Sequence, residues 1–195
     1  MFGIGNWFKS KKGKINVEFS DAYLRGGTMQ NRIHFEKFLS EDDFQYYLDL
    51  VSNEEVMLMN YGRVFTLEES KLTYKGMLKN NKNYEAFGYF KVFEKDTNVF
   101  IGLGAITLNN DSAEAEIEYM LMPDYWRKGY GSEIVRNLLK KAEETNSIHK
   151  VIAITDPNNL ISKKILHNNG FVSSKIFKID DGSLAEMHIK VKSNK

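Results

Sequence analysis

The chain has 195 residues, enough for one good-sized hydrophobic core but short for a second full domain. Its 27 lysines and arginines nearly balance 26 aspartates and glutamates, leaving a net charge of +1, so no global positive field would draw it onto nucleic acid. The chain has no cysteine, which excludes disulfides, thiolate zinc sites and a cysteine nucleophile, and which suits a reducing compartment such as the cytoplasm.

We interpret residues 1–31 as a tail that precedes the folded domain. Its apolar residues come before its lysines in MFGIGNWFKSKKGK, the reverse of the order in a secretory signal. Such a segment could rest on an anionic membrane surface, but Gly3 and Gly5 weaken any helix there, so we do not expect membrane contact. The longest apolar run, at 99–108, is far shorter than the roughly 18 residues of a membrane span. We therefore expect one cytoplasmic domain over residues 32–192.

The first part of this domain is predicted to be a strand followed by two helices. Residues 32–38 alternate between apolar and polar side chains, as in a short strand. Ser40 is placed to cap a helix whose apolar residues recur at helical spacing. Thr66 with Glu69 matches a capping box and predicts a second helix that ends near residue 78. We expect these two helices to precede the main sheet.

The rest of the chain predicts strands with one crossover. Aromatic and β-branched residues dominate two segments on either side of DTN, which has the composition of a tight turn, so they predict a hairpin. The expected elements are strands at 84–95, 98–109 and 113–122, a helix at 129–144, a strand at 150–155, a helix at 160–167, and a closing hairpin at 170–179 and 183–191. This order indicates an α+β fold, with a mixed, mostly antiparallel central sheet flanked by helices and a βαβ crossover.

A glycine-rich junction joins the third of these strands to the next helix, in MLMPDYWRKGYGSEI at 120–134. The start of a helix leaves backbone N–H groups unpaired at the positive end of the helix dipole. Gly129 and Gly131 lack the Cβ atoms that would keep an anion from the backbone. A Walker A loop needs Gly-Lys-Ser/Thr, and a Rossmann fingerprint needs a third glycine where Ile134 stands. The junction is therefore predicted to be a phosphate site that is neither a Walker A loop nor a Rossmann loop. The alternative is that the glycines only shape the loop.

The segments AEIEYMLMPDYWRKGYGSEIV and NNLISKKILHNNGF resemble, in order and separation, two motifs of the Gcn5-related N-acetyltransferase (GNAT) superfamily. Within it, YWRKGYG and NLIS…NNGF are most similar to the RimJ/RimL-type branch, which acetylates N-terminal residues of ribosomal proteins. The resemblance covers roughly residues 32–192 and implies a GNAT-like fold whose βαβ crossover binds acetyl-CoA as cosubstrate, without a metal. Carried over by position, it assigns the pyrophosphate loop to Arg127, Lys128, Gly129, Tyr130, Gly131 and Ser132.

Acetyl transfer to an amine needs a base, because an alkyl ammonium has a pKa near ~10.4. By resemblance Glu116 matches the base of several relatives. Glu118 lies on the same strand face and could equally be the base, or both could be solvated strand residues. The resemblance also implies that backbone N–H groups around Met120, Leu121 and Met122 bind the pantetheine arm and polarise the thioester carbonyl.

The departing thiolate needs a proton, and the oxyanion of the tetrahedral intermediate needs a hydrogen-bond donor. Asn159 and Ser162 match the N-x-x-S of the RimJ/RimL-type branch, where these residues lie near the cofactor arm and the sulfur, so the resemblance makes Ser162 a candidate acid or oxyanion partner. Asn159 also fits the cap of the helix that follows. Leu166 stands where many relatives carry a tyrosine acid, so that role needs another group. The four histidines show no metal-ligand spacing.

The acceptor of the acetyl group stays open. It is expected to be a primary amine, on a protein N-terminus or on a small molecule such as an aminoglycoside, polyamine or amino acid. A non-catalytic CoA-binding regulatory module is an alternative, and it gains support if neither Glu116 nor Glu118 faces the cleft. A dinucleotide-binding protein with Asp156 as its ribose acid is a further alternative, although the missing third glycine argues against it.

Overall fold

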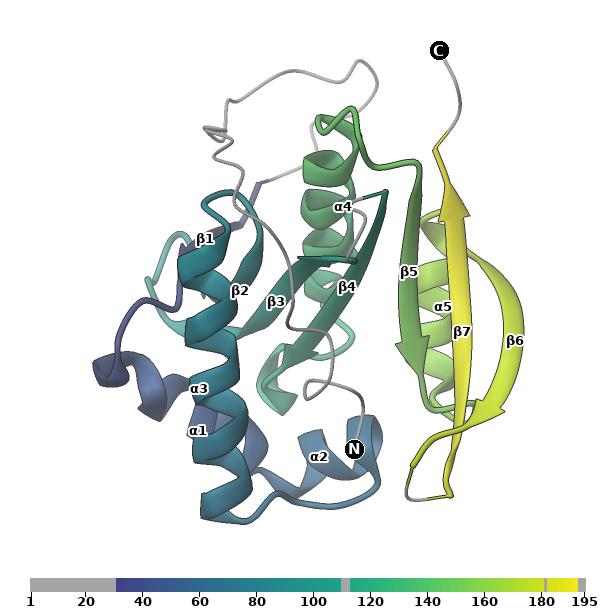
Figure 1. Ribbon diagram of the computed structural model, residues 1–195. Coiled ribbons are helices and arrows are strands. Elements are labelled where there is room, and N and C mark those ends of the chain that lie inside the picture. The colour runs from purple at the N-terminus through teal and green to yellow at the C-terminus, as the bar shows by residue number, and fades with distance from the viewer. Residues whose placement is uncertain (1–30, 110–112, 181, 193–195) are drawn as a thin grey trace.

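A seven-stranded mixed sheet runs through the molecule in the order β1-β2-β3-β4-β5-β7-β6 (Figure 1). All neighbouring strands pair antiparallel except β4 and β5, which are parallel. The structure is a computed structural model that describes residues 31–109, 113–180 and 182–192, so all of the expected tail except residue 31 lies outside the described residues. The predicted α+β fold with a mostly antiparallel sheet and one βαβ crossover is confirmed.

The strands and helices follow the predicted order with one addition. The strands are β1 (Ile33–Lys37), β2 (Gly88–Glu94), β3 (Phe100–Leu108), β4 (Glu114–Leu121), β5 (Lys150–Thr155), β6 (Val172–Lys178) and β7 (Leu184–Val191). The α-helices are α1 (Phe44–Val51), α2 (Glu54–Tyr61), α3 (Leu67–Asn83), α4 (Tyr130–Glu143) and α5 (Leu160–Asn168), and short 3-10 turns precede α1 and α4. None of these helices of the described chain is long and apolar enough to cross a membrane.

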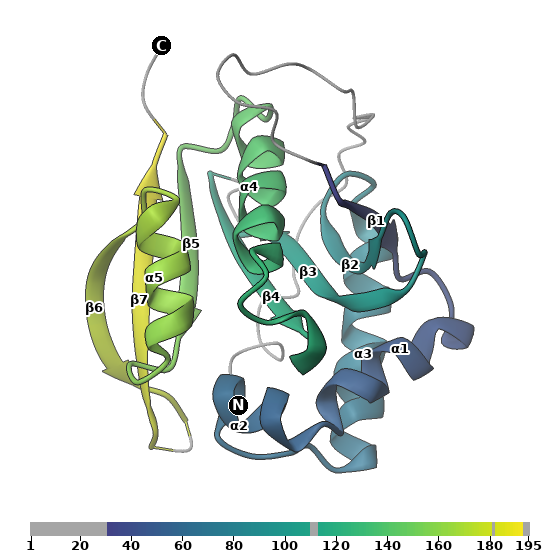
Figure 2. The ribbon, with the colours of Figure 1, turned by 180° about the vertical axis from the view of Figure 1, so that it is seen from behind.

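The helices form a layer on each face of the sheet. Helices α1, α2 and α3 cover one face, and α4 and α5 cover the other (Figures 1 and 2). Side chains alternate along β4, so Met120 joins the core under α1–α3, whereas Ile117 and Leu121 join the core under α4 and α5. By the same alternation, Glu116 and Glu118 point to the α1–α3 face.

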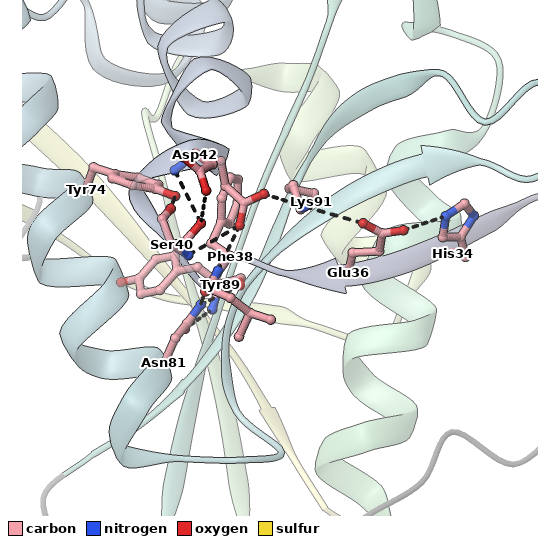
Figure 3. Close-up of polar contacts among 11 residues, drawn as sticks. His34, Glu36, Phe38, Ser40, Asp42, Tyr74, Asn81, Tyr89 and Lys91 are labelled. Carbon is pink, nitrogen blue, oxygen red and sulfur yellow. Dashed lines mark hydrogen bonds and ion pairs between the residues drawn. The ribbon is translucent and has the colours of Figure 1, made fainter.

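Side chains cap the helices where the sequence predicts caps. Ser40 caps the 3-10 turn that leads into α1, and Thr66 with Glu69 forms the predicted capping box at α3. Helix α3 continues to Asn83, beyond the predicted end near residue 78. Its last turns are held against the sheet, because the Asn81 amide donates to the carbonyls of Phe38 and Tyr89 at 2.8 and 2.9 Å (Figure 3).

Helix α2 was not predicted, so the expectation of two helices before the sheet is wrong. Asn53 caps α2 by accepting a hydrogen bond from the Val56 N–H, and Gly62 ends it in the left-handed conformation with φ of 71°. Both residues are ordinary helix signals. The run of apolar residues at 56–59 shows no one-sided stripe, which hid the helix from an analysis of periodicity. Helix α2 ends at Tyr61, whose hydroxyl contacts Glu118 of β4.

Strands β4 and β5 part soon after they meet. They pair only at Glu114, Ala115 and Glu116, whose partners are residues 150–152. Beyond that point β4 continues beside β3, and β5 continues beside β7. The sheet therefore opens between the carboxyl ends of two parallel strands, the usual position of a ligand site in a βαβ unit.

Candidate active site

A cleft of about 590 Å³, counting its open mouth, lies where β4 and β5 part. Residues 116–120 of β4 form one wall and residues 153–156 form the other. The ends of α2 and α5 close it with Tyr61, Asn159 and Ser162, among others. Because residues from both faces of β4 line this space, the cleft connects the two faces of the sheet.

Two carboxylates, Glu116 and Glu118, line the cleft on the α1–α3 side. Burial raises the pKa of Glu116 to about 7, and the neighbouring Glu118 charge adds to the effect. Burial also raises the pKa of Glu118, but the Tyr61 hydroxyl opposes that rise by donating a hydrogen bond of 2.7 Å to Oε1 of Glu118. The alternative of two solvated strand residues does not fit these surroundings.

A second polar pair, Tyr119 and Ser162, lines the cleft from the α4–α5 side. Their hydroxyl oxygens are 2.7 Å apart. Burial raises the pKa of Tyr119 to about 12, so its phenol stays protonated at neutral pH and can donate. Leu166 lies fully buried in the same wall and offers no polar group. The sequence analysis did not identify Tyr119 as a site residue. Because side chains alternate along a strand, its position in AEIEY places it on the face opposite to both glutamates.

Asn159 holds the start of α5 and joins it to α2. Its side-chain oxygen accepts from the Ser162 N–H at 3.0 Å, which confirms the predicted helix cap. Its amide nitrogen donates to the Met59 carbonyl at 3.2 Å. The two helices that close the cleft are therefore linked by one side chain.

Helix α4 begins at the glycine-rich junction with its first N–H groups open. Gly129 occupies the N-cap position with φ of 86°, and among the described residues no side chain caps the helix. The N–H of Glu133 is the first to bond within the helix, to the Gly129 carbonyl at 3.1 Å. The N–H groups of residues 130–132 precede that bond, at the positive end of the dipole. This end of α4 fits an anion, as the resemblance implies.

The two glycines of the junction have different roles. Gly129 is exposed, and its left-handed backbone suits glycine. Gly131 is buried, and a Cβ there would lie 3.0 Å from the Cδ1 atom of Ile165 in α5. The missing Cβ of Gly131 therefore allows α4 to pack against α5. That the missing Cβ also makes room for an anion stays a prediction.

Arg32 braces the junction from the start of β1. Its Nε atom lies 3.0 Å from Oε2 of the buried Glu133, and its two terminal nitrogens donate to the Lys128 carbonyl at 3.1 Å. The guanidinium lies 4.2 Å from the centre of the Tyr130 ring, whose hydroxyl donates to Glu94. The buried Tyr130 side chain is thus held by Arg32 and Glu94, so the group that Tyr130 offers to a ligand at the junction is its backbone N–H. No local motif marks Arg32, which is about a hundred residues away in the chain.

The backbone of β4 offers fewer donors to a ligand than predicted. The Met122 N–H donates to the Ile101 carbonyl at 2.9 Å, so it is not available. Hydrogen bonding alternates along an antiparallel pair, so Met120 also turns its N–H toward β3, and Leu121 turns its own away from β3. The Leu121 carbonyl accepts from the Trp126 indole at 2.8 Å, which fixes the start of the junction.

The chain is similar in sequence and in fold to known proteins of one family. Residues 32–172 match the family model described as an acetyltransferase (GNAT) domain. The uncharacterized N-acetyltransferase YnaD of Bacillus subtilis is 27% identical over 136 residues, which are 70% of this chain and 77% of YnaD.

Solved structures of similar fold include two complexes with CoA. Spermidine N-acetyltransferase from Vibrio cholerae, solved with CoA and spermine, is 16% identical with a TM-score of 0.67 over 83% of this chain and 96% of that chain. RimL, the ribosomal L7/L12 alpha-N-protein acetyltransferase, solved with CoA, is 15% identical with a TM-score of 0.68 over 83% of this chain and 95% of that chain. At these identities the likeness is one of fold.

Proposed function

The chain belongs to the acetyltransferase (GNAT) family and is an N-acetyltransferase, and from that premise we propose that it transfers an acetyl group from acetyl-CoA directly to a primary amine. The observation that carries this proposal is the cleft between β4 and β5, which opens on both faces of the sheet. Anion-binding N–H groups of α4 stand on one face, and two carboxylates stand on the other. A thioester and an amine can thus approach each other from opposite sides.

The start of α4 would hold the diphosphate of acetyl-CoA, which supplies the acetyl thioester. The N–H groups of residues 130–132 would donate to the phosphate oxygens, and the exposed side chains of Arg127 and Lys128 would add positive charge. Leu121, with its N–H turned away from β3, would donate to the pantetheine arm. Arg32 keeps the junction in place through the Lys128 carbonyl.

Glu116 would take the proton from the acceptor ammonium. Burial raises its pKa to about 7, which makes it far more basic than an exposed glutamate. On the opposite face, the Ser162 hydroxyl would donate a proton to the departing thiolate. The Tyr119 hydroxyl, which is hydrogen-bonded to Ser162, would then return a proton to Ser162. Glu118 is the second candidate for the base.

For the acceptor, we propose a primary amine on a protein N-terminus, as the RimJ/RimL-type motifs imply. A small amine is the second candidate, because the structural relatives include a spermidine acetyltransferase. The non-catalytic alternative would gain support if neither Glu116 nor Glu118 faced the cleft, and both line it. The dinucleotide alternative is wrong, since the family match identifies an acetyltransferase, and Asp156 accepts a hydrogen bond from the Asn158 N–H in the turn before α5.

A panel of N-terminal peptides and small amines tests the proposal. Each compound is incubated with the protein and acetyl-CoA, and free thiol is followed against a sample without acceptor. We expect acceptor-dependent thiol release that Glu116→Gln reduces. Binding of acetyl-CoA without release of thiol for any amine would contradict the proposed transfer.

A further inference from the structure

Tyr61, the last residue of α2, reaches the carboxylate pair of the cleft from an element that sequence reasoning missed. Its hydroxyl donates to Oε1 of Glu118 at 2.7 Å, across 57 positions of the chain. The cap at Asn53 and the left-handed Gly62 fix the two ends of α2, and Asn159 holds its last turn through the Met59 carbonyl. The Tyr61 hydroxyl therefore comes from a helix end that is held on several sides.

We propose that Tyr61 is a positioning residue for acetyl transfer: its hydroxyl holds Glu118 as a carboxylate beside Glu116, and Glu118 in turn sets the pH at which Glu116 takes a proton. The inference rests on the proposed function in one respect, that the proton taken by Glu116 comes from the acceptor ammonium. The coupling of the three side chains is a property of the free protein and can be measured without an acceptor.

Among the titratable side chains that face Glu118, Glu116 is the one whose charge changes near neutral pH. Tyr47 of α1, Tyr61 of α2 and Tyr89 of β2 face the pair, and burial raises the pKa of each phenol well above its ordinary value of 10.0. These phenols stay neutral. Asp156, on the opposite wall of the cleft, is engaged with the Asn158 N–H.

The direction of the coupling follows from like charges. A hydrogen bond from Tyr61 favours the ionised form of Glu118, and an ionised Glu118 disfavours ionisation of Glu116. Removing the hydroxyl raises the proton affinity of Glu118, so Glu118 becomes neutral at a higher pH. Glu116 then loses its charged neighbour and releases its proton at a lower pH.

The test is a pH titration of the full chain labelled with ¹³C at the glutamate carboxyls, with Glu116→Gln and Glu118→Gln used to assign the two signals. In Tyr61→Phe we expect the midpoint of Glu116 to fall by roughly one pH unit, and in Glu118→Gln by at least as much. Once an acceptor is known, the acid limb of kcat/KM should move in the same direction.

Tyr74→Phe is the matched control. Tyr74 is also a buried tyrosine, and its hydroxyl donates to the Ser40 carbonyl at 2.6 Å, outside the cleft lining (Figure 3). Its loss should lower stability and leave the Glu116 midpoint at the wild-type value. A Glu116 midpoint in folded Tyr61→Phe that equals the control, or that rises, overturns the inference. If the wild-type protein acetylates no amine, the proposed function fails, while the titration still decides whether Tyr61 sets the midpoint.

Discussion

Replacing Glu116 by Gln should slow turnover and, at the same time, stabilise the folded protein at alkaline pH. Both effects come from one carboxyl group that is held in the cleft between β4 and β5. Gln keeps the size and polarity of the side chain but can neither ionise nor accept the proton of the amine. Loss of a general base typically slows the chemical step by roughly 10²- to 10⁴-fold.

The size of the stability effect follows from the pKa of Glu116, which is about 7 in place of the ordinary 4.5. The folded state binds the proton more tightly than the unfolded chain does. Ionisation of Glu116 therefore costs stability as the pH rises above about 4.5, and the full cost is present above about pH 7. The difference between the two values corresponds to roughly 3 kcal/mol, a cost that Gln avoids.

Urea unfolding of the wild type and of Glu116→Gln, at pH 5 and at pH 8.5, measures this effect. The advantage of the variant at pH 8.5 should exceed its advantage at pH 5 by about 2 to 3 kcal/mol. If the advantage of the variant did not change with pH, the raised pKa of Glu116 would be refuted. Unchanged turnover, measured as thiol release with a known acceptor, would refute the role of Glu116 as the base, and a larger loss in Glu118→Gln would transfer that role to Glu118.

Three further substitutions test the glycine-rich junction and its support. Gly131→Ala should change the free energy of unfolding in urea by less than about 1 kcal/mol, because the helical preference of alanine opposes the close approach of its Cβ to Cδ1 of Ile165, 3.0 Å away, and adding Ile165→Val should relieve that approach. Gly129→Ala should cost about 1 kcal/mol, because φ is 86° there, and should weaken acetyl-CoA binding in calorimetry. Arg32→Ala should cost about 1 to 2 kcal/mol, because the buried Glu133 carboxylate loses the guanidinium and keeps the backbone N–H of residue 32, which donates to its Oε1 at 2.6 Å. Equal acetyl-CoA affinity in folded Arg32→Ala would show that the brace has no part in binding.

Local patterns account for the elements of this protein that were predicted correctly. The alternation of AEIEY assigned both glutamates to one face of β4, and the structure places both in the cleft. Ser40, Thr66 and Asn159 were identified as caps because a cap depends on backbone groups two or three residues away. Helix α2 has such a cap but lacks an apolar stripe, so the periodicity of its side chains did not reveal it.

The sequence by itself determined the order of strands and helices, the family motifs and the junction at which α4 begins, because these depend on backbone propensities and on side-chain periods within one element. Tertiary structure alone decided which distant residues complete the site. Arg32 meets Glu133 across 101 positions, and Tyr61 meets Glu118 across 57. Such pairs depend on how the elements pack, and a side chain on a helix end carries no local mark of the strand it will reach. The same packing turned Gly131 toward α5 and left the carboxylates partly buried, which sets the pKa of Glu116.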